Sequence, residues 1–112
     1  MLDAALPRTS LILLACNQAS TVRAAAESCL AQVGEPLEIV FSDDASADDT
    51  HRVLCDVAQA YRGPHQVRVV RNPVNLGIGA HYNRLIETTH GALIVTAAGD
   101  DVREPVWGPF LR

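Results

Sequence analysis

Two pairs of adjacent aspartates, Asp43-Asp44 and Asp100-Asp101, each follow a short apolar run of the sequence. If both runs are strands of one parallel sheet, their carboxyl ends bring the four carboxylates towards the same edge. Carboxylates gathered in this way repel one another unless a cation or a set of hydrogen-bond donors compensates their charge. A divalent metal with oxygen ligands is the simplest compensation, and a diphosphate could complete its coordination shell.

Each pair also has a purely structural interpretation. The segment Asp43-Asp44-Ala45-Ser46 fits a turn and a helix cap, because Asp and Ser are favoured at both. Asp100-Asp101, which follows Gly99, fits a turn or a cap equally well. Neither pair alone decides between structure and chemistry, but the occurrence of both at equivalent strand ends favours a site.

The elements that must position these acids are short. Four apolar runs alternate with three segments of helical period, which predicts the order βαβαβαβ. The runs are continuous rather than alternating, as in parallel strands that are covered on both faces. Right-handed crossovers then give an α/β fold with a Rossmann-like, doubly wound parallel sheet in three layers, α/β/α. The predicted strands are residues 11–15, 37–41, 67–70 and 92–96.

Capping residues and glycines predict the helix boundaries. Ser20 is suited to cap the first helix and Gly34 to end it. The second helix is expected to stop at Gly63-Pro64 and the third near Gly91. The residues expected on the inward faces of the three helices are Val22, Ala26, Cys29, Leu30 and Val33; Val53, Leu54, Val57, Ala58 and Tyr61; and Ile78, Tyr82, Leu85 and Ile86.

The composition excludes several classes of function. The 112 residues are 48% hydrophobic, as expected of one globular domain, and residues 104–112 form an irregular tail. All nine basic residues are Arg, which excludes a P-loop and a Schiff-base enzyme because both need a Lys. The net charge of −4, without a basic patch, argues against nucleic-acid binding.

The cysteines and the N-terminus favour a cytoplasmic protein. Cys16, Cys29 and Cys55 lie in apolar runs without a CxxC motif, which predicts reduced and buried thiols; Cys16 is expected to be a small core residue. The N-terminus does not resemble a signal peptide, and the longest apolar run, Leu11–Cys16, is too short to span a bilayer. We expect a cytoplasmic chain, either free or peripheral at the cytoplasmic face of the membrane.

Other polar residues fit structural roles better than chemical ones. Asp48 and Asp49 suit the N-terminus of the second helix, and Gly77-Ile78-Gly79 is a turn into the third helix rather than a dinucleotide fingerprint. Arg71 is expected to be solvated, and Asn83 to make a polar contact between helix and loop. The histidines have no metal-ligand spacing and are expected on the surface: His51, His65, His81 and His90.

Four segments in register over residues 9–103 resemble the family 2 glycosyltransferases of the GT-A fold. These segments are SLILLACN at 10–17, FSDDASAD at 41–48, NLG at 75–77 together with Asn83, and GDD at 99–101. The resemblance implies that residues 1–112 are a single domain, the N-terminal, nucleotide-binding half of a GT-A enzyme.

The resemblance also implies roles for residues at the first two strand ends. The loop after the first strand, Ala15, Cys16 and Asn17, would line the nucleotide pocket. Asp44 would hydrogen-bond the base, and Asp43 would support that loop or the ribose. The donor implied in this way is a UDP-, GDP- or dTDP-sugar.

A metal is implied at the last acidic pair, which is DXD-like. Asp101 would bind Mg²⁺ or Mn²⁺, and Asp100 would lie near the ribose or the metal. The metal would bridge the diphosphate and stabilise the departing nucleoside diphosphate. Many members of the family carry a further Asp two residues before this pair, where this chain has Ala98, a departure that bears on metal binding.

The implied reaction is transfer of a sugar to a saccharide, lipid or protein acceptor, as in polysaccharide biosynthesis. The acceptor-binding half and the catalytic base of the family lie downstream of the acidic pair. We therefore expect a truncated chain, and no base is assigned.

Two alternatives stay open. One is a catalytically inert α/β module that binds a nucleotide or a partner chain. The other is a phosphorelay receiver, which is disfavoured because receivers need a Lys and carry their acidic pair after the first strand. In the truncated chain, an uncovered sheet edge would favour self-association.

Overall fold

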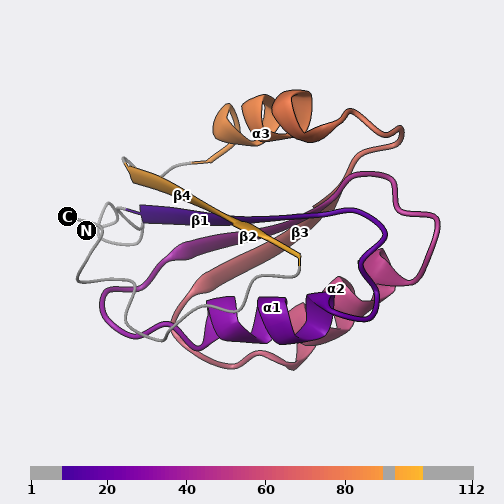
Figure 1. Cartoon of the computed structure of the whole chain (residues 1–112). Helices are drawn as coiled ribbons and strands as arrows, with labels where there is room; N and C mark the ends of the chain where they lie inside the picture. The colour runs from indigo at the N-terminus through magenta and orange to yellow at the C-terminus, as the bar shows by residue number, and fades with distance from the viewer. Residues whose placement is uncertain (1–8, 90–92, 100–112) are drawn as a thin grey trace.

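The computed structural model describes residues 9–89 and 93–99, which form a four-stranded parallel sheet with the strand order β3-β2-β1-β4 (Figure 1). The predicted order βαβαβαβ is confirmed. The strands are β1 (Thr9–Ala15), β2 (Glu38–Asp43), β3 (Gln66–Arg71) and β4 (Leu93–Ala98), and the helices are α1 (Val22–Leu30), α2 (Thr50–Ala60) and α3 (Ile78–Ile86).

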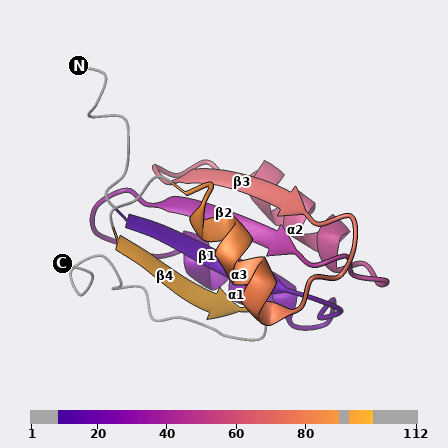
Figure 2. The same cartoon turned by 90° about the horizontal axis from the view of Figure 1, so that it is seen from above.

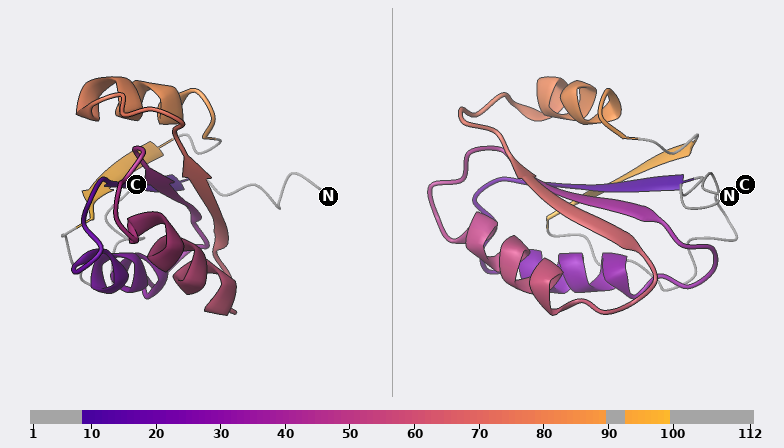
Figure 3. Two further views of the ribbon diagram at one scale, coloured as in Figure 1. Left: turned by 90° about the vertical axis from the view of Figure 1, so that its right-hand side faces the viewer. Right: turned by 180° about the vertical axis from the view of Figure 1, so that it is seen from behind.

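Helices cover both faces of the sheet, as predicted for three layers. Among the described residues, helices α1 and α2 lie on one face and α3 is the one helix on the other (Figures 1 and 3). Leu11 and Leu13 of β1 pack in the core beneath α1 and α2, whereas Ile12 packs with Leu85 of α3 in a second, smaller core. Successive strand residues point to opposite faces, so a sheet buried on both sides requires the continuous apolar runs that the sequence contains.

The topology brings the carboxyl ends of all four strands to one edge. In the parallel register Ala15 pairs with Asp43, Leu14 with Ala98, and Asp43 with Arg71. The chain runs outward from β1 through β2 to β3, and then crosses by way of α3 to β4 on the other side of β1 (Figure 2). The order therefore reverses between β1 and β4, and ligands bind at such a switch point in open α/β sheets.

The edge strands bear on the expected self-association, and the helix lengths bear on whether the chain could cross a membrane. Strands β3 and β4 are the edges of the sheet within the described residues, so self-association through an edge stays a prediction. No helix in the described part of the chain is long and apolar enough to cross a membrane.

Two predictions about α1 were wrong. The N-cap position is Thr21 rather than Ser20, its side chain makes no capping hydrogen bond to the helix, and the helix ends at Leu30 rather than running to Gly34. Val33 is consequently 56% exposed instead of lying on the buried face. Beyond the end of the helix, the carbonyl group of Gln32 bonds to a histidine ring from a later segment, His65.

The other helices differ less from the prediction. Helix α2 ends at Ala60, shortly before Gly63-Pro64, and α3 ends at Ile86, ahead of Gly91. Ile78 is 79% exposed, so it does not share the buried face of α3 that was predicted for it. It is the first residue of the helix and precedes the turns that contact the sheet.

His65 was predicted to lie on the surface, but it is buried and joins two segments. Its Nδ1 accepts a hydrogen bond from the backbone N–H of Leu37 (2.9 Å), and its Nε2 lies 2.8 Å from the carbonyl oxygen of Gln32. Because Leu37 supplies a donor, Nδ1 must be the acceptor and Nε2 must carry the proton. The ring also stacks on Tyr61, with 6.1 Å between centroids.

Replacing His65 with leucine is expected to lower the free energy of unfolding by about 2–3 kcal/mol, because it removes two buried hydrogen bonds, one from the N–H of Leu37 and one to the carbonyl group of Gln32. Urea denaturation measures this loss. The matched control is His51→Leu on α2, since His51 is only partly buried and contacts a side chain, Cys55, rather than the backbone. Equal losses in the two variants would contradict a bridging role for His65.

Candidate functional site

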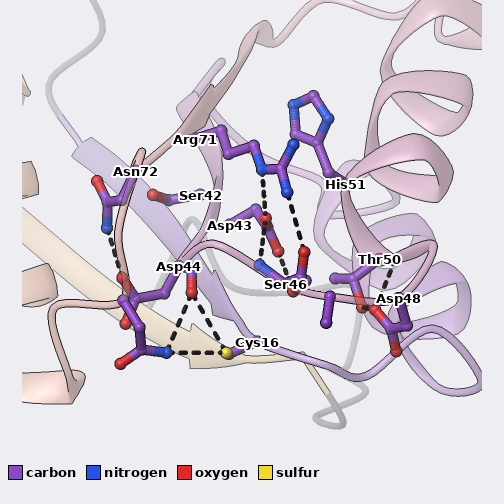
Figure 4. Close-up of polar contacts among 12 residues, drawn as sticks. Cys16, Ser42, Asp43, Asp44, Ser46, Asp48, Thr50, His51, Arg71 and Asn72 are labelled. Carbon is purple, nitrogen blue, oxygen red and sulfur yellow. Dashed lines mark hydrogen bonds and ion pairs between the residues drawn. The ribbon is translucent and has the colours of Figure 1, made fainter.

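Asp44 stands at the end of β2, between the loops that follow β1 and β3 (Figure 4). Its backbone N–H donates to the carbonyl oxygen of Ala15 (2.9 Å). Its carboxylate accepts hydrogen bonds from Asn72 Nδ2 (2.8 Å), from the N–H of Leu76 (2.8 Å) and from the N–H of Gly77 (3.0 Å). The side chain is almost entirely buried, and it holds the loop before α3 onto the end of β2.

The pKa of Asp44 reflects two opposing effects. Burial raises the pKa, but the hydrogen bonds from Leu76, Asn72 and Gly77 outweigh it, and the pKa lies below the usual 3.8. Asp44 is therefore an ionised, acceptor-only group at neutral pH. Three donors from the protein leave its two oxygens with one acceptor position.

Asp43 has a different role from its neighbour. Its fully buried carboxylate accepts a hydrogen bond from the N–H of Ser46 (3.0 Å) and one from the Ser46 hydroxyl, and pairs with Arg71 Nε at 3.3 Å. Arg71 also donates to the Ser46 carbonyl oxygen (2.9 Å), so it is half-exposed but ion-paired rather than simply solvated. Asp43 therefore supports the loop after β2, and the role predicted for it at the nucleotide site stays a prediction.

The loop after β1 is tied to the loop after β2. Asn17 has a φ of 53°, a left-handed conformation that Asn tolerates. Its N–H donates to Ser46 Oγ (2.8 Å), and its Oδ1 accepts from the N–H of Ala47 (2.8 Å). Cys16 is half-buried and not a core residue; its thiol donates to the carbonyl oxygen of Asp44 (3.3 Å) and accepts from Asn75 Nδ2 (3.3 Å).

A cavity of about 470 Å³ opens beside these loops at the switch point between β1 and β4. The ends of both strands, the β1 loop, Asp44 and the first turn of α3 contribute to its walls. Among the lining residues are Ala15, Cys16, Asp44, Ile78, His81 and Ala98. Three of the predicted nucleotide-binding residues, Ala15, Cys16 and Asp44, therefore line one cavity, whereas Asp43 and Asn17 support the loops around it.

His81 was predicted to be a surface residue, and this was wrong. It is 2% exposed, and its Nε2 lies 2.6 Å from Ser42 Oγ on β2. Burial lowers its pKa below 6.5; the charges of Asp44 and Asp43 oppose this shift, and Arg84 adds to it. The sequence holds a signal for this burial, because His81 lies four residues before Leu85 and so shares its buried helix face.

The unfolding free energy is expected to fall as the pH drops below about 6.5, since the unfolded chain then takes up a proton that folded His81 resists. Above that pH the contribution of His81 is complete. A second loss is expected below 3.8, where the unfolded form of Asp44 binds a proton more readily than the folded form. Urea denaturation between pH 8 and pH 3 measures both, and His81→Gln should remove only the first. An unchanged first slope in His81→Gln would contradict this assignment.

Asp48 and Asp49 have the structural roles predicted for them. The carboxylate of Asp48 accepts from Thr50 Oγ1 (2.5 Å) and from the N–H of Thr50 (2.9 Å), which lowers its pKa. It also accepts from the N–H of Ala19 (3.2 Å), while Asp49 pairs with Arg52 at 3.0 Å. The Asp48 carboxylate thus satisfies an amide at the start of α2.

The remaining polar predictions have mixed outcomes. Gly77 has a φ of 80° and directly precedes α3, as expected of a turn into a helix. Asn83 is exposed on α3. His90 lies outside the described residues.

Asp100 and Asp101, the predicted metal ligands, also lie outside the described residues. The residue before them, Gly99, accepts a hydrogen bond on its carbonyl oxygen from Thr21 Oγ1 (3.1 Å). A Cβ at Gly99 would come within 3.1 Å of Ala15 Cβ and 2.3 Å of Gln18 Oε1, so β4 ends in close contact with the loop after β1. Within residues 9–89 and 93–99, no group of three or more His, Cys, Asp or Glu could hold a metal.

Sequence comparisons find relatives that are named for succinoglycan biosynthesis and chondroitin synthesis. ExoO of Rhizobium meliloti, a succinoglycan biosynthesis protein, is 32% identical over 99 residues, which are 88% of this chain and 27% of ExoO. The chondroitin synthase of Escherichia coli is 32% identical over 99 residues, 88% of this chain and 14% of the synthase. The chain therefore spans about a quarter or less of the length of these two relatives.

Solved structures show the same fold. The mannosyltransferase PcManGT from Pyrobaculum calidifontis, in complex with GDP-Man and Mn²⁺, has a TM-score of 0.77 at 22% identity, covering 87% of this chain and 28% of that one. S. aureus TarS (residues 1–349) with UDP has a TM-score of 0.75 at 21% identity, covering 89% and 29%. Glucosyl-3-phosphoglycerate synthase of Mycobacterium tuberculosis, with Mn²⁺, UDP and glucosyl-3-phosphoglycerate, has a TM-score of 0.67 at 25% identity, covering 88% and 36%.

The family assignment rests on the match along the chain. The fold is that of GT-A glycosyltransferases, as the sequence predicted. The model of glycosyl transferase family 2 matches residues 10–109, nearly the whole chain, so this chain belongs to glycosyltransferase family 2.

Proposed function

We propose that this chain is the donor-binding part of a glycosyltransferase, which holds a nucleoside diphosphate sugar, with a divalent metal, for transfer to an acceptor. The observation that carries the proposal is the cavity at the switch point, with the ionised Asp44 in its wall. Fold alone would not suffice, because similar α/β sheets serve many functions.

The chemistry of Asp44 restricts the base. An ionised carboxylate with one remaining acceptor position pairs with an N–H donor of the ligand. Uracil, thymine and guanine each carry a ring N–H on their pairing edge. Cytosine and adenine carry an unprotonated ring nitrogen there, whose lone pair a carboxylate repels, and they donate on that edge only through an exocyclic amino group. UDP-, dTDP- and GDP-sugars are therefore the proposed donor class. This agrees with the GDP-Man and UDP bound by the structural neighbours.

The metal is proposed to bind at Asp100 and Asp101. Carboxylate oxygens are the hard ligands that Mg²⁺ and Mn²⁺ prefer, so the donor set fits either ion. When bound, such an ion supplies Lewis-acid neutralisation of charge on the diphosphate. Gly99, the residue before Asp100 in the sequence, contacts Ala15 and Gln18, which line the cavity. Two of the structural neighbours are complexes with Mn²⁺.

The acceptor and the location are further parts of the proposal. The relatives named for succinoglycan biosynthesis and for chondroitin synthesis favour a saccharide acceptor over a lipid or a protein. A cytoplasmic location, free or at the cytoplasmic membrane face, is supported by three free cysteines within the described residues. We assign no residue of the chain as the base that deprotonates the acceptor.

Isothermal titration of the chain with UDP, GDP and dTDP, with and without Mn²⁺, tests this proposal. CDP and ADP serve as matched ligands with the same diphosphate. We expect at least one of the first three to bind, more tightly with Mn²⁺ than without it, and CDP and ADP to bind more weakly. No binding of any nucleotide by a chain shown to be folded would exclude the function.

A further inference from the structure

The end of β2 is attached to the start of α3 at two points on the wall of the cavity. Ser42 Oγ meets His81 Nε2 at 2.6 Å, and the carboxylate of Asp44 accepts from the N–H of Gly77 at 3.0 Å. The N–H of His81 in turn donates to the carbonyl oxygen of Gly77 at 3.0 Å. Ser42, His81, Gly77 and Asp44 thus form a closed ring of contacts that joins the strand to the first turn of the helix.

The contacts among Ser42, His81, Gly77 and Asp44 matter because little else holds the first turn of α3. In the part of the chain that the structure describes, no other helix lies on its face of the sheet (Figures 1 and 3). Its second buried residue, Leu85, anchors it one turn further along. Residues 78–80 are exposed, so the buried ring of His81 is the side-chain anchor at the N-terminal end of α3.

The surroundings of His81 favour a neutral ring that bonds to Ser42. Burial disfavours the charged form, while Asp44 and Asp43 on the β2 side favour it and Arg84 on α3 opposes it. Among the described residues, Ser42 is the hydrogen-bond partner found for the ring. Ser42 itself is fully buried, so each group depends on the other to satisfy a buried polar atom.

We propose that His81 is a positioning residue for the nucleotide. Through Ser42 it fixes the first turn of α3, and so keeps the amides of Leu76 and Gly77 on the Asp44 carboxylate, whose remaining acceptor position then faces the base. His81 acts through Asp44 and takes no part in the chemistry. This inference rests on the proposed nucleotide binding.

Two substitutions of His81 by side chains of nearly equal size separate the effect of the hydrogen bond from the effect of packing. Glutamine places a terminal amide near the position of Nε2, whereas methionine fills the same space without a hydrogen-bonding group. Titration with UDP, GDP and dTDP in Mn²⁺ is expected to show His81→Met binding about tenfold more weakly and His81→Gln within about twofold of the unmutated chain. Ser42→Ala should weaken binding as much as His81→Met, and the double variant no more than either.

Amide hydrogen exchange supplies a second measurement. Exchange at Leu76 and Gly77 is expected to be faster in His81→Met and unchanged in His81→Gln. Equal affinity of His81→Met and the unmutated chain, or equal weakening in both His81 variants, would overturn the positioning role. If the unmutated chain binds no nucleotide, the proposed function fails and this inference falls with it. Binding that is lost in Asp44→Asn but kept in His81→Met would overturn only the inference.

Discussion

Asp44→Asn is expected to weaken nucleotide binding at least tenfold and to erase the preference for UDP, GDP or dTDP over CDP and ADP. A hydrogen bond to a charged partner contributes about 1.5–3 kcal/mol, and about 1.4 kcal/mol corresponds to a tenfold change in affinity. The amide of asparagine offers one acceptor oxygen, and Leu76 and Asn72 already bond to Oδ1. Its NH₂ group would replace Oδ2, the oxygen that is proposed to face the base.

The same substitution is expected to lower the free energy of unfolding by about 2–3 kcal/mol, because the N–H of Gly77 then faces a donor instead of Oδ2. Both effects are measured on one sample, by titration and by urea denaturation. Asp56→Asn is the control, since Asp56 is an exposed aspartate on α2 near Arg52 and remote from the cavity. Unchanged affinity and base preference in Asp44→Asn would remove Asp44 from the site.

The substitution Asp101→Asn is expected to abolish the dependence of nucleotide binding on metal. Losing a carboxylate ligand removes a charged oxygen from the coordination shell, for which an amide oxygen is a poor substitute. We expect binding in Mn²⁺ to fall at least tenfold, to the level that the unmutated chain shows without metal. Titration with the preferred nucleotide, with and without Mn²⁺, measures both values.

Asp49→Asn is the matched control for this experiment. Asp49 is the N-cap residue of α2, and it is exposed and paired with Arg52. Its substitution should leave the effect of Mn²⁺ intact. If Asp101→Asn still binds more tightly in Mn²⁺, the metal is held elsewhere and the assignment to the last acidic pair is wrong.

The strands could be predicted from the sequence because both faces of the sheet are buried. Leu11, Ile12 and Leu13 point alternately to the two cores, so consecutive residues of this strand must all be apolar. The end of α1 could not be predicted in the same way. Gly34 and Val33 suggested a longer helix, but α1 ends at Leu30. The segment that follows it is instead tied to His65, which lies 33 residues after Gln32 in the sequence.

The location of the candidate site could be predicted from the sequence, but the separate roles of its residues could not. Sequence reasoning placed Asp43 and Asp44 together at a strand end, yet their carboxylates serve different loops, because one bonds to Ser46 and the other to Leu76 and Gly77. The burial of His81 was missed because histidine is usually judged by metal-ligand spacing. Its partner Ser42 lies 39 residues away, and no local pattern reveals that contact.

The most direct test of nucleotide binding at the cavity is to follow the backbone amides of the isotopically labelled chain by NMR during titration with UDP, GDP or dTDP in Mg²⁺. We expect the largest shifts at Cys16, Asp44 and Gly77, around the cavity, and little change at Glu38 and Gln66, at the opposite ends of their strands. A folded chain whose spectrum does not change, or whose shifts gather away from the carboxyl ends of the strands, would contradict it.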